Sequence, residues 1–427
     1  MDMGGNPGRY VWFTALYNAR AYYPILAILF LDLGLTLDQY VMLNLVWAAT
    51  IFLFEVPSGA LADTFGRKNL LVTASILMVV EMCCLLFAPK DGGWLLFVVC
   101  LANRFLSGLS EAAASGADEA LAYDSLPEKN RDDAWDAVLA RAMRLRSVGF
   151  VIAMVVGGLL YDPAVVNRVL PENWAISGTV AHRLPVALVL MQALACVCIT
   201  LRMVEPKHAN HESVAKACGS ALKLTLSTAK WVFTNPATLV IVMAGMAIDC
   251  VVRNFATINS SYYRLIELPE WSFGFIGASL GLLGYVVPTI AAEINKRFDT
   301  LTCLCIIACV ALVGLVGIVP AAPWWGIAPA MLLMTTLGFL GFTMSRALNR
   351  ESDSARRATV LSVKGLAFNL AYGAFSLGFS LLLTSFPKEP DGVALRSALL
   401  WQVPFFAFTV FFLLWWGRGR LLRARSI

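Results

Sequence analysis

The feature that most constrains this chain is a series of long apolar runs separated by short polar segments. Because a helix rises 1.5 Å per residue, about 20 apolar residues cross a hydrocarbon core of about 30 Å. The sequence predicts twelve membrane-spanning helices, at 10–34, 40–62, 70–88, 93–117, 138–160, 183–202, 236–260, 271–293, 301–319, 323–346, 359–385 and 397–417. An even number of spans places both chain ends on one side of the membrane.

The composition agrees with this reading. Hydrophobic residues make up 59% of the chain and charged residues 14%, against roughly 45–50% and about 25% in soluble proteins. Such a chain has too few charges to cover its surface in water. We therefore expect an all-α, multi-pass protein of a plasma or bacterial inner membrane, with membrane lipid as a partner. The first apolar run is long enough to span and is expected to remain in the mature protein.

The 33 lysines and arginines are distributed unevenly about the predicted spans. Twenty-three lie in the two tails and the even-numbered loops, and six lie in the opposite loops. Since basic residues gather on the cytoplasmic side, both termini are predicted to be cytoplasmic. The remaining four lie within or at the edge of spans: Arg20, Arg104, Arg253 and Lys364. This scattering between apolar runs does not suit a nucleic-acid partner.

The longest polar connection lies in the middle of the chain, from about 203 to 230. It divides the sequence into a six-helix part at 1–202, a cytoplasmic linker at 203–235 and a second six-helix part at 236–427. A weak internal echo supports two related halves, because Val56-Pro57-Ser58 and Val287-Pro288-Thr289 occupy matching places in the second and eighth spans. Parallel halves of this kind are one architecture for alternating access.

A short polar segment follows the second predicted span, reading Glu55-Val-Pro-Ser-Gly-Ala-Leu-Ala-Asp-Thr-Phe-Gly-Arg-Lys68. It resembles the signature loop of the major facilitator superfamily, G-x-L-A-D-x-x-G-R-K. The matching residues are Gly59, Leu61, Ala62, Asp63, Gly66, Arg67 and Lys68. Gly66 permits a tight turn, and Asp63 can face a helix N-terminus, where negative charge is favoured.

This resemblance implies the major facilitator fold, with twelve helices in two six-helix bundles, and a transporter rather than an enzyme. It implies a monomer with no cofactor and no metal. In that family the aspartate equivalent to Asp63 holds the two halves together at the eleventh helix, which here would begin near Arg357. Gly59, Asp63, Gly66, Arg67 and Lys68 are therefore predicted to form a cytoplasmic gate.

Two further motifs are similar to the family's patterns but depart from them. The run from Arg104 to Ser110 keeps Arg104 and Gly108 of R-x-x-Q-G-x-G, an arginine tied to proton transfer in proton-coupled members. Gly157-Gly158 resembles the end of the antiporter motif, although Val155-Val156 replaces the preceding Gly-Pro pair. The direction of transport stays open on this evidence.

Charges inside predicted spans are the candidate functional residues, because a charge at the bilayer centre costs roughly 2.5–3.5 kcal/mol and needs a cavity or a partner. Arg20 and Asn18 lie about ten residues into the first span. Arg104, Glu111 and Asp118 recur every seven residues and so share one face of a helix. In the resembled family the first, fourth, seventh and tenth helices line the cavity.

Asp249 and Arg253 are four residues apart on the seventh span and can pair within their own helix. That pairing is as reasonable an interpretation as a functional one, and Arg104 and Glu111 can equally bridge to other helices. Arg20 has no acid three or four residues away, which favours a role in the cavity. Glu81, on the third span, has no evident role.

These charges suggest that the substrate is a small organic solute with a negative group, held by Arg20 and Arg253 with Arg104 nearby. Arginine suits carboxylate and phosphate geometry. Glu111, Asp249 and Glu55 are candidates for carrying a coupling proton, because alternating access to water would change their affinity for it. Asn18 and the aromatic Tyr372 complete the predicted binding residues.

Other functions compete with this hypothesis. Proton-driven efflux of lipophilic, drug-like compounds would leave the arginines neutralised by the same acids. A membrane-embedded enzyme or a non-transporting receptor is the alternative from another class. The pair His208 and His211 has no further ligand at metal spacing except Glu212, so we interpret it as part of a solvated segment.

Overall fold

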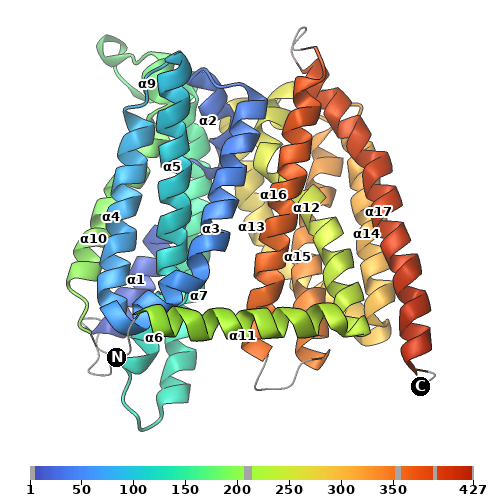
Figure 1. Cartoon of the computed structure of the whole chain (residues 1–427). Helices are drawn as coiled ribbons and strands as arrows, with labels where there is room; N and C mark the ends of the chain where they lie inside the picture. The colour runs from blue at the N-terminus through green and yellow to red at the C-terminus, as the bar shows by residue number, and fades with distance from the viewer. Residues whose placement is uncertain (1–4, 206–213, 352–356, 388–391, 426–427) are drawn as a thin grey trace. The chain divides into compact units, whose positions relative to one another are not determined.

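The computed structural model describes residues 5–205, 214–351, 357–387 and 392–425, and every regular element in these ranges is a helix (Figure 1). Eleven helical segments among them are long and apolar enough to cross a membrane. Each overlaps one of the predicted spans after the first, so these eleven predictions are confirmed. The chain is a multi-pass, all-helical protein.

The helices up to residue 205 are α1 Asn6–Asn18, η1 Tyr23–Ile25, α2 Leu26–Asp32, α3 Leu37–Phe65, α4 Arg67–Leu86, α5 Gly93–Ala114, α6 Ala117–Asp124, α7 Arg131–Tyr161, α8 Pro163–Val169, η2 Glu172–Trp174, α9 Gly178–Ala181 and α10 Leu184–Leu201. Those after residue 213 are α11 Val214–Thr234, α12 Pro236–Leu265, α13 Glu270–Arg297, α14 Thr300–Ile318, α15 Ile327–Glu351, α16 Arg357–Thr384 and α17 Val393–Arg425.

The first predicted span, 10–34, is wrong as a continuous helix. It is interrupted between Asn18 and Tyr23, giving α1, the short 3₁₀ turn η1, and α2. Pro24 explains the interruption, because proline has no amide hydrogen and disfavours helical geometry at the preceding residue. The carbonyl of Arg20 instead accepts a hydrogen bond from the amide of Tyr23 at 3.1 Å.

The fourth predicted span, 93–117, coincides with α5, and a break at its end separates it from a short helix. α5 ends at Ala114 and α6 begins at Ala117, with Gly116 between them at φ +73°. Only glycine adopts this left-handed conformation without a steric cost. The predicted series of charges on one helix face therefore stops at Glu111, and its extension to Asp118 is wrong.

The chain packs into two compact units. Unit 1 consists of residues 1–36, 46–221 and 269–281, and unit 2 of residues 37–45, 222–268 and 282–427. The start of α3 thus packs with unit 2, where the Tyr40 hydroxyl donates to the Thr257 carbonyl at 3.0 Å. The start of α13 packs with unit 1, where the backbone of Gly274 lies against Gly158 of α7.

The two exchanged segments begin at residues 37 and 269, at the starts of α3 and α13. The prolines of the Val-Pro-Ser and Val-Pro-Thr echo, Pro57 and Pro288, lie inside these same two helices and have almost the same separation along the chain. The second and eighth predicted spans therefore have matching places in the two units. The linear boundaries at 202 and 236 do not include this exchange.

Candidate functional site

Unit 2 contains a cavity of about 300 Å³ between α12, α15 and α16. α12 contributes Asp249 and Arg253, and α16 contributes Lys364 and Asn369. The wall from α15 is apolar. The remaining lining residues are Leu337, Leu340, Gly341, Met344, Gly365 and Phe368. The cavity thus combines an apolar wall with a small charged group, as ligand sites commonly do.

The charged group is built around Arg253. One guanidinium nitrogen lies 2.7 Å from Oδ2 of Asp249, one helical turn earlier. Another nitrogen donates to Oδ1 of Asn369 on α16 at 2.8 Å. The guanidinium also lies over the ring of Tyr372, 5.5 Å from its centroid, and the Tyr372 hydroxyl shares a 2.9 Å hydrogen bond with Thr257. The structure therefore brings together Arg253, Asp249 and Tyr372, three of the predicted site residues.

Lys364 is the second cation of the cavity. Its ammonium lies 5.5 Å from the ring centroid of Phe368. Within the described ranges no carboxylate lies at ion-pair distance from the Lys364 ammonium. Asp249 lines the same cavity as both Lys364 and Arg253. Lys364 is one of the four basic residues within or at the edge of predicted spans, but its sequence context assigns it no role. An unexplained lysine within a span was the signal that could have identified it.

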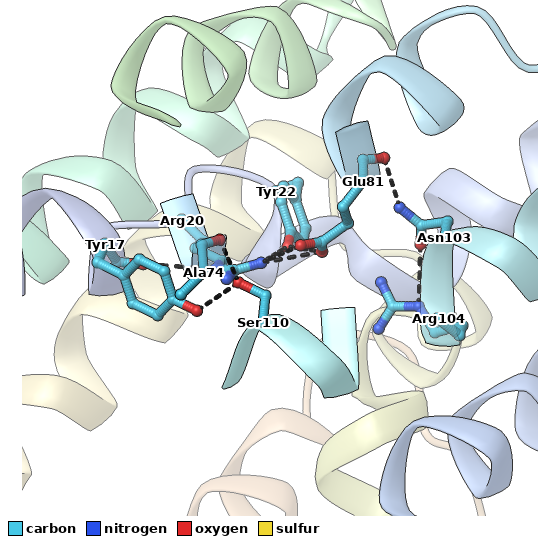
Figure 2. Close-up of polar contacts among 8 residues, drawn as sticks. All are labelled: Tyr17, Arg20, Tyr22, Ala74, Glu81, Asn103, Arg104 and Ser110. Atoms are coloured by element: carbon cyan, nitrogen blue, oxygen red, sulfur yellow. Dashed lines mark hydrogen bonds and ion pairs between the residues drawn. The ribbon is translucent and has the colours of Figure 1, made fainter. Parts of the chain in front are cut away.

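Unit 1 holds a separate polar cluster, which Figure 2 shows around Arg20 and Glu81. Arg20 Nη1 lies 2.9 Å and 3.2 Å from the two carboxylate oxygens of Glu81 on α4. The Tyr22 hydroxyl accepts from Arg20 at 2.8 Å and donates to Glu81 at 3.3 Å. Arg20 is 2% exposed and Glu81 0%, so this is a fully buried ion pair. Glu81, which had no evident role, is the partner of Arg20.

Arg104 lies beside this pair on α5. The Asn103 amide donates to the backbone carbonyl of Glu81 at 2.8 Å, and the Asn103 amide oxygen accepts from Arg104 Nε at 3.1 Å (Figure 2). The guanidinium stacks 5.0 Å from the ring centroid of Phe30. Arg104 is 4% exposed, and one terminal nitrogen has no hydrogen-bond partner among the described residues. It is a buried cation without a paired carboxylate in that part of the chain.

Three other predicted site residues are placed as follows. The Asn18 amide donates to the Thr14 carbonyl of its own helix at 2.7 Å. Glu111 is partly buried on α5, and Glu55 is partly buried on α3. Neither carboxylate makes an ion pair with any residue that the structure describes. Close to the Arg20 pair, the Ser110 hydroxyl donates a hydrogen bond to the Ala74 carbonyl. The Tyr17 hydroxyl is therefore the donor in its 2.6 Å hydrogen bond to Ser110.

The signature loop turns between α3 and α4 at Gly66, whose φ is +97°. The Glu205 carboxylate accepts from the backbone amides of Arg67 and Lys68 at 3.0 Å and 2.7 Å, and so closes the N-terminus of α4. The Arg67 guanidinium pairs with Asp124 at the end of α6. Gly59 is exposed on α3. The side chain of Asp63 lies outside the described residues, as does that of Arg357.

Glu205 and Asp124 are partners of the signature loop that were not predicted from the sequence. Glu205 follows the sixth predicted span directly, and an acid at a helix end facing another helix N-terminus was the available signal. The Asn6 amide donates to the Val204 carbonyl, next to Glu205, and to the Ser125 hydroxyl, next to Asp124, so it helps to hold both partners in place. Histidines 208 and 211 lie outside the described residues.

A family model described as Major Facilitator Superfamily matches residues 11–376. The solved nucleoside transporter NupG is 13% identical, with a TM-score of 0.70 over 99% of each chain. A bacterial homolog of the human lysosomal transporter Spinster, inward-facing and occupied, is 15% identical, with a TM-score of 0.67 over 98% of this chain and 96% of that chain. A D-xylose–proton symporter is 13% identical, with a TM-score of 0.63 over 96% of this chain and 95% of that chain. No curated protein sequence matches the chain.

Proposed function

Because the chain belongs to the Major Facilitator Superfamily and is a multi-pass membrane transporter rather than an enzyme, we propose that it moves a small organic anion by alternating access. The observation that carries the proposal is the cavity of unit 2, where Asp249 is the one acid among the described lining residues and Arg253 and Lys364 are the two basic ones. Such a cavity keeps one positive charge in excess. A negatively charged group on the solute neutralises that excess.

The proposed architecture has twelve spans in two six-helix bundles, with the interrupted α1, η1 and α2 as the first span. The boundaries follow the sequence, with bundles at 1–202 and 236–427 joined by a linker at 203–235. Both termini are cytoplasmic by the distribution of basic residues. The signature loop then lies on the cytoplasmic side, where Asp63 acts as a latch and Glu205 and Asp124 hold the loop in place.

The anion is proposed to bind Arg253 and Lys364 with its charged group and to lay its apolar body against Met344 and Phe368. Arginine offers paired donors to a carboxylate or phosphate, whereas lysine acts as a point charge. In a low-dielectric cavity both interactions are stronger than in water. In unit 1, Arg104 is the corresponding candidate, because it is buried and no described carboxylate pairs with it. Arg20 is already paired with Glu81, and its contact with solute remains a prediction.

Proton coupling is proposed to arise from competition for Arg253. While Asp249 is ionised, it occupies a guanidinium nitrogen at 2.7 Å. When Asp249 takes up a proton, Arg253 is released and the cavity carries two positive charges, so an anion binds more strongly. A proton and an anion then cross together. The solved D-xylose–proton symporter supports proton coupling as one use of this fold. Glu111 and Glu55 remain candidates for further proton carriers.

The test is a ligand screen on the purified protein in detergent, read by thermal unfolding. A ligand that binds the native state raises its stability with the logarithm of concentration. We expect small organic anions to stabilise the wild type and Lys364→Ala to weaken the effect by roughly tenfold or more, since a hydrogen bond to a charged group contributes about 1.5–3 kcal/mol. Binding should strengthen as pH falls, and Asp249→Asn should bind strongly without that pH dependence.

Lys296→Ala is the matched control, because Lys296 is an exposed lysine of the same unit that pairs with Glu293 at 3.5 Å. It should leave anion binding unchanged. If lipophilic cations stabilise the protein and Lys364→Ala does not affect them, the anion proposal is wrong and efflux of lipophilic compounds is favoured. If anions bind equally well to Lys364→Ala, the cavity of unit 2 is not the site.

A further inference from the structure

α11, residues Val214–Thr234, is an amphipathic helix in the linker that the transport proposal does not use. Its sequence contains three lysines and no acidic residue. From Leu222 onward it belongs to unit 2, and Figure 1 shows it running crosswise to α12, the span that follows. A helix crosswise to a membrane-spanning helix runs along the membrane surface.

The corner between the two helices is held by specific contacts. The Asn235 side chain accepts from the amides of Ala237 and Thr238 at 2.9 Å and 3.3 Å, and so caps α12. The Thr238 hydroxyl donates to the Val232 carbonyl of α11 at 2.7 Å. Pro236 occupies the first position of α12, where it needs no amide partner. The direction of α11 relative to α12 is therefore fixed rather than left to a loose connection.

The exposed face of α11 carries a basic stripe and an apolar stripe. Lys223 and Lys230 are exposed and seven residues apart. Leu226 and Phe233, 60% and 41% exposed, are also seven residues apart and each follows a lysine by three. At 100° per residue, the apolar stripe lies about 60° around the helix from the lysines. On the opposite side Thr228 and Val232 are buried against the protein.

We propose that this face of α11 is a binding surface for anionic phospholipids of the cytoplasmic leaflet. Leu226 and Phe233 enter the boundary between headgroups and acyl chains, and Lys223 and Lys230 reach the lipid phosphates beside them. A basic helix with an adjacent exposed apolar stripe is suited to such a surface. Lysine can lay its apolar stem along the acyl boundary and keep its ammonium in the headgroup layer.

The charge and the apolar stripe of α11 together favour an anionic membrane surface over other binding partners. An acidic soluble partner would satisfy the lysines but would leave Leu226 and Phe233 in water. A neutral membrane would cover the apolar stripe but would gain nothing from a helix that has only positive charges. An anionic bilayer surface satisfies both stripes. The inference uses the proposed placement of α11 on the cytoplasmic side, but it does not depend on which solute is transported.

The experiment titrates the full-length protein in detergent with phosphatidylglycerol or with phosphatidylcholine, and follows thermal unfolding. Phosphatidylglycerol should stabilise the wild type at lower concentration than phosphatidylcholine. Each lysine near an anionic surface is expected to change the affinity about fivefold, so Lys223→Ala with Lys230→Ala should require about 25-fold more phosphatidylglycerol. High salt should weaken the wild-type response, because it screens exposed charges.

Arg141→Ala with Arg144→Ala is the matched control, since both arginines are exposed on α7 and lie on the same proposed side of the membrane. This control should respond as the wild type does. Equal stabilisation by the two lipids, or an unchanged response in the lysine variant, overturns the proposal. It is also overturned if both double variants lose the response equally, or if soluble polyglutamate replaces phosphatidylglycerol. A failed solute screen would leave these lipid results unaffected.

Discussion

At the scale of single residues, the buried pair of Arg20 and Glu81 has the largest energetic consequence. Moving two charges out of water is costly, and their mutual attraction offsets that cost only while both are present. Here the pair is completed by the Tyr22 hydroxyl, and Arg20 Nε also donates to the Tyr17 carbonyl at 3.4 Å. Removing one partner leaves an uncompensated charge in the interior of unit 1.

We therefore predict that Glu81→Gln lowers the free energy of unfolding by about 3–5 kcal/mol, the usual loss when one member of a buried pair is removed. Adding Arg20→Met should recover most of the loss, because the double variant buries no unpaired charge. Denaturant unfolding in detergent measures both. Glu111→Gln is the control, since this partly buried carboxylate makes no ion pair in the described chain. A Glu81→Gln protein as stable as the control would refute the role of the pair.

The sequence could locate the charges of the site but not all of their partners. Asp249 and Arg253 are four residues apart, so their pairing was one of the two interpretations available from spacing alone. Arg20 and Glu81 are 61 residues apart, and only the packing of α4 against the interrupted first span brings them together. Lys364 was visible as a charge within a span, yet its place in the cavity depends on how α16 packs against α12.

At the scale of elements, the interruption of the first span is stabilised by the close approach of α7. A Cβ added at Gly157 would overlap the backbone carbonyl of Ala21, within the interruption. Glycine at 157 therefore lets α7 lie directly against the buried backbone of the interruption. Close packing of this kind matters inside a membrane, where no water is available to hydrogen-bond the unpaired groups.

We predict that Gly157→Ala destabilises the protein by about 1–3 kcal/mol, the usual cost of overpacking, although alanine is the better helix former by about 1 kcal/mol. Gly149→Ala is the matched control on the same helix. Its added Cβ would meet the Ala19 side chain at 3.6 Å, an ordinary contact, so it should be neutral or slightly stabilising. Thermal unfolding of the two variants tests the prediction, and equal unfolding temperatures would contradict it.

The fold was predictable where apolar length alone decides the outcome. Eleven spans follow from apolar runs long enough to cross the bilayer, and their helices lie where the sequence placed them. The interruptions were harder to predict, because membrane helices often tolerate proline and glycine. Pro24 breaks the first span, whereas Pro57 and Pro288 lie inside unbroken helices. Tertiary contacts, such as the approach of Gly157, distinguish the two cases.

At the scale of the whole molecule, the two units repeat one plan. The segments that they exchange begin at residues 37 and 269, and each forms the start of a long helix with an internal proline. Among the described residues, each unit also places an acid–base pair near a second basic residue: Arg20 and Glu81 with Arg104 in unit 1, and Asp249 and Arg253 with Lys364 in unit 2. A repeat of this kind is what an ancestral duplication would produce.

The twelve spans that we propose would place both termini on one side of the membrane, and the basic residues predict that this side is cytoplasmic. A green fluorescent protein fused after Ile427 should therefore fluoresce. Alkaline phosphatase, which is active only after export, should be active when fused after Gly92 and inactive when fused after Asn130. The basic run from Lys129 to Arg146 would have to be exported in the opposite orientation, against the retention of positive charge. Phosphatase activity at Asn130 without activity at Gly92 would therefore reverse the topology, and with it the cytoplasmic placement of the signature loop and α11.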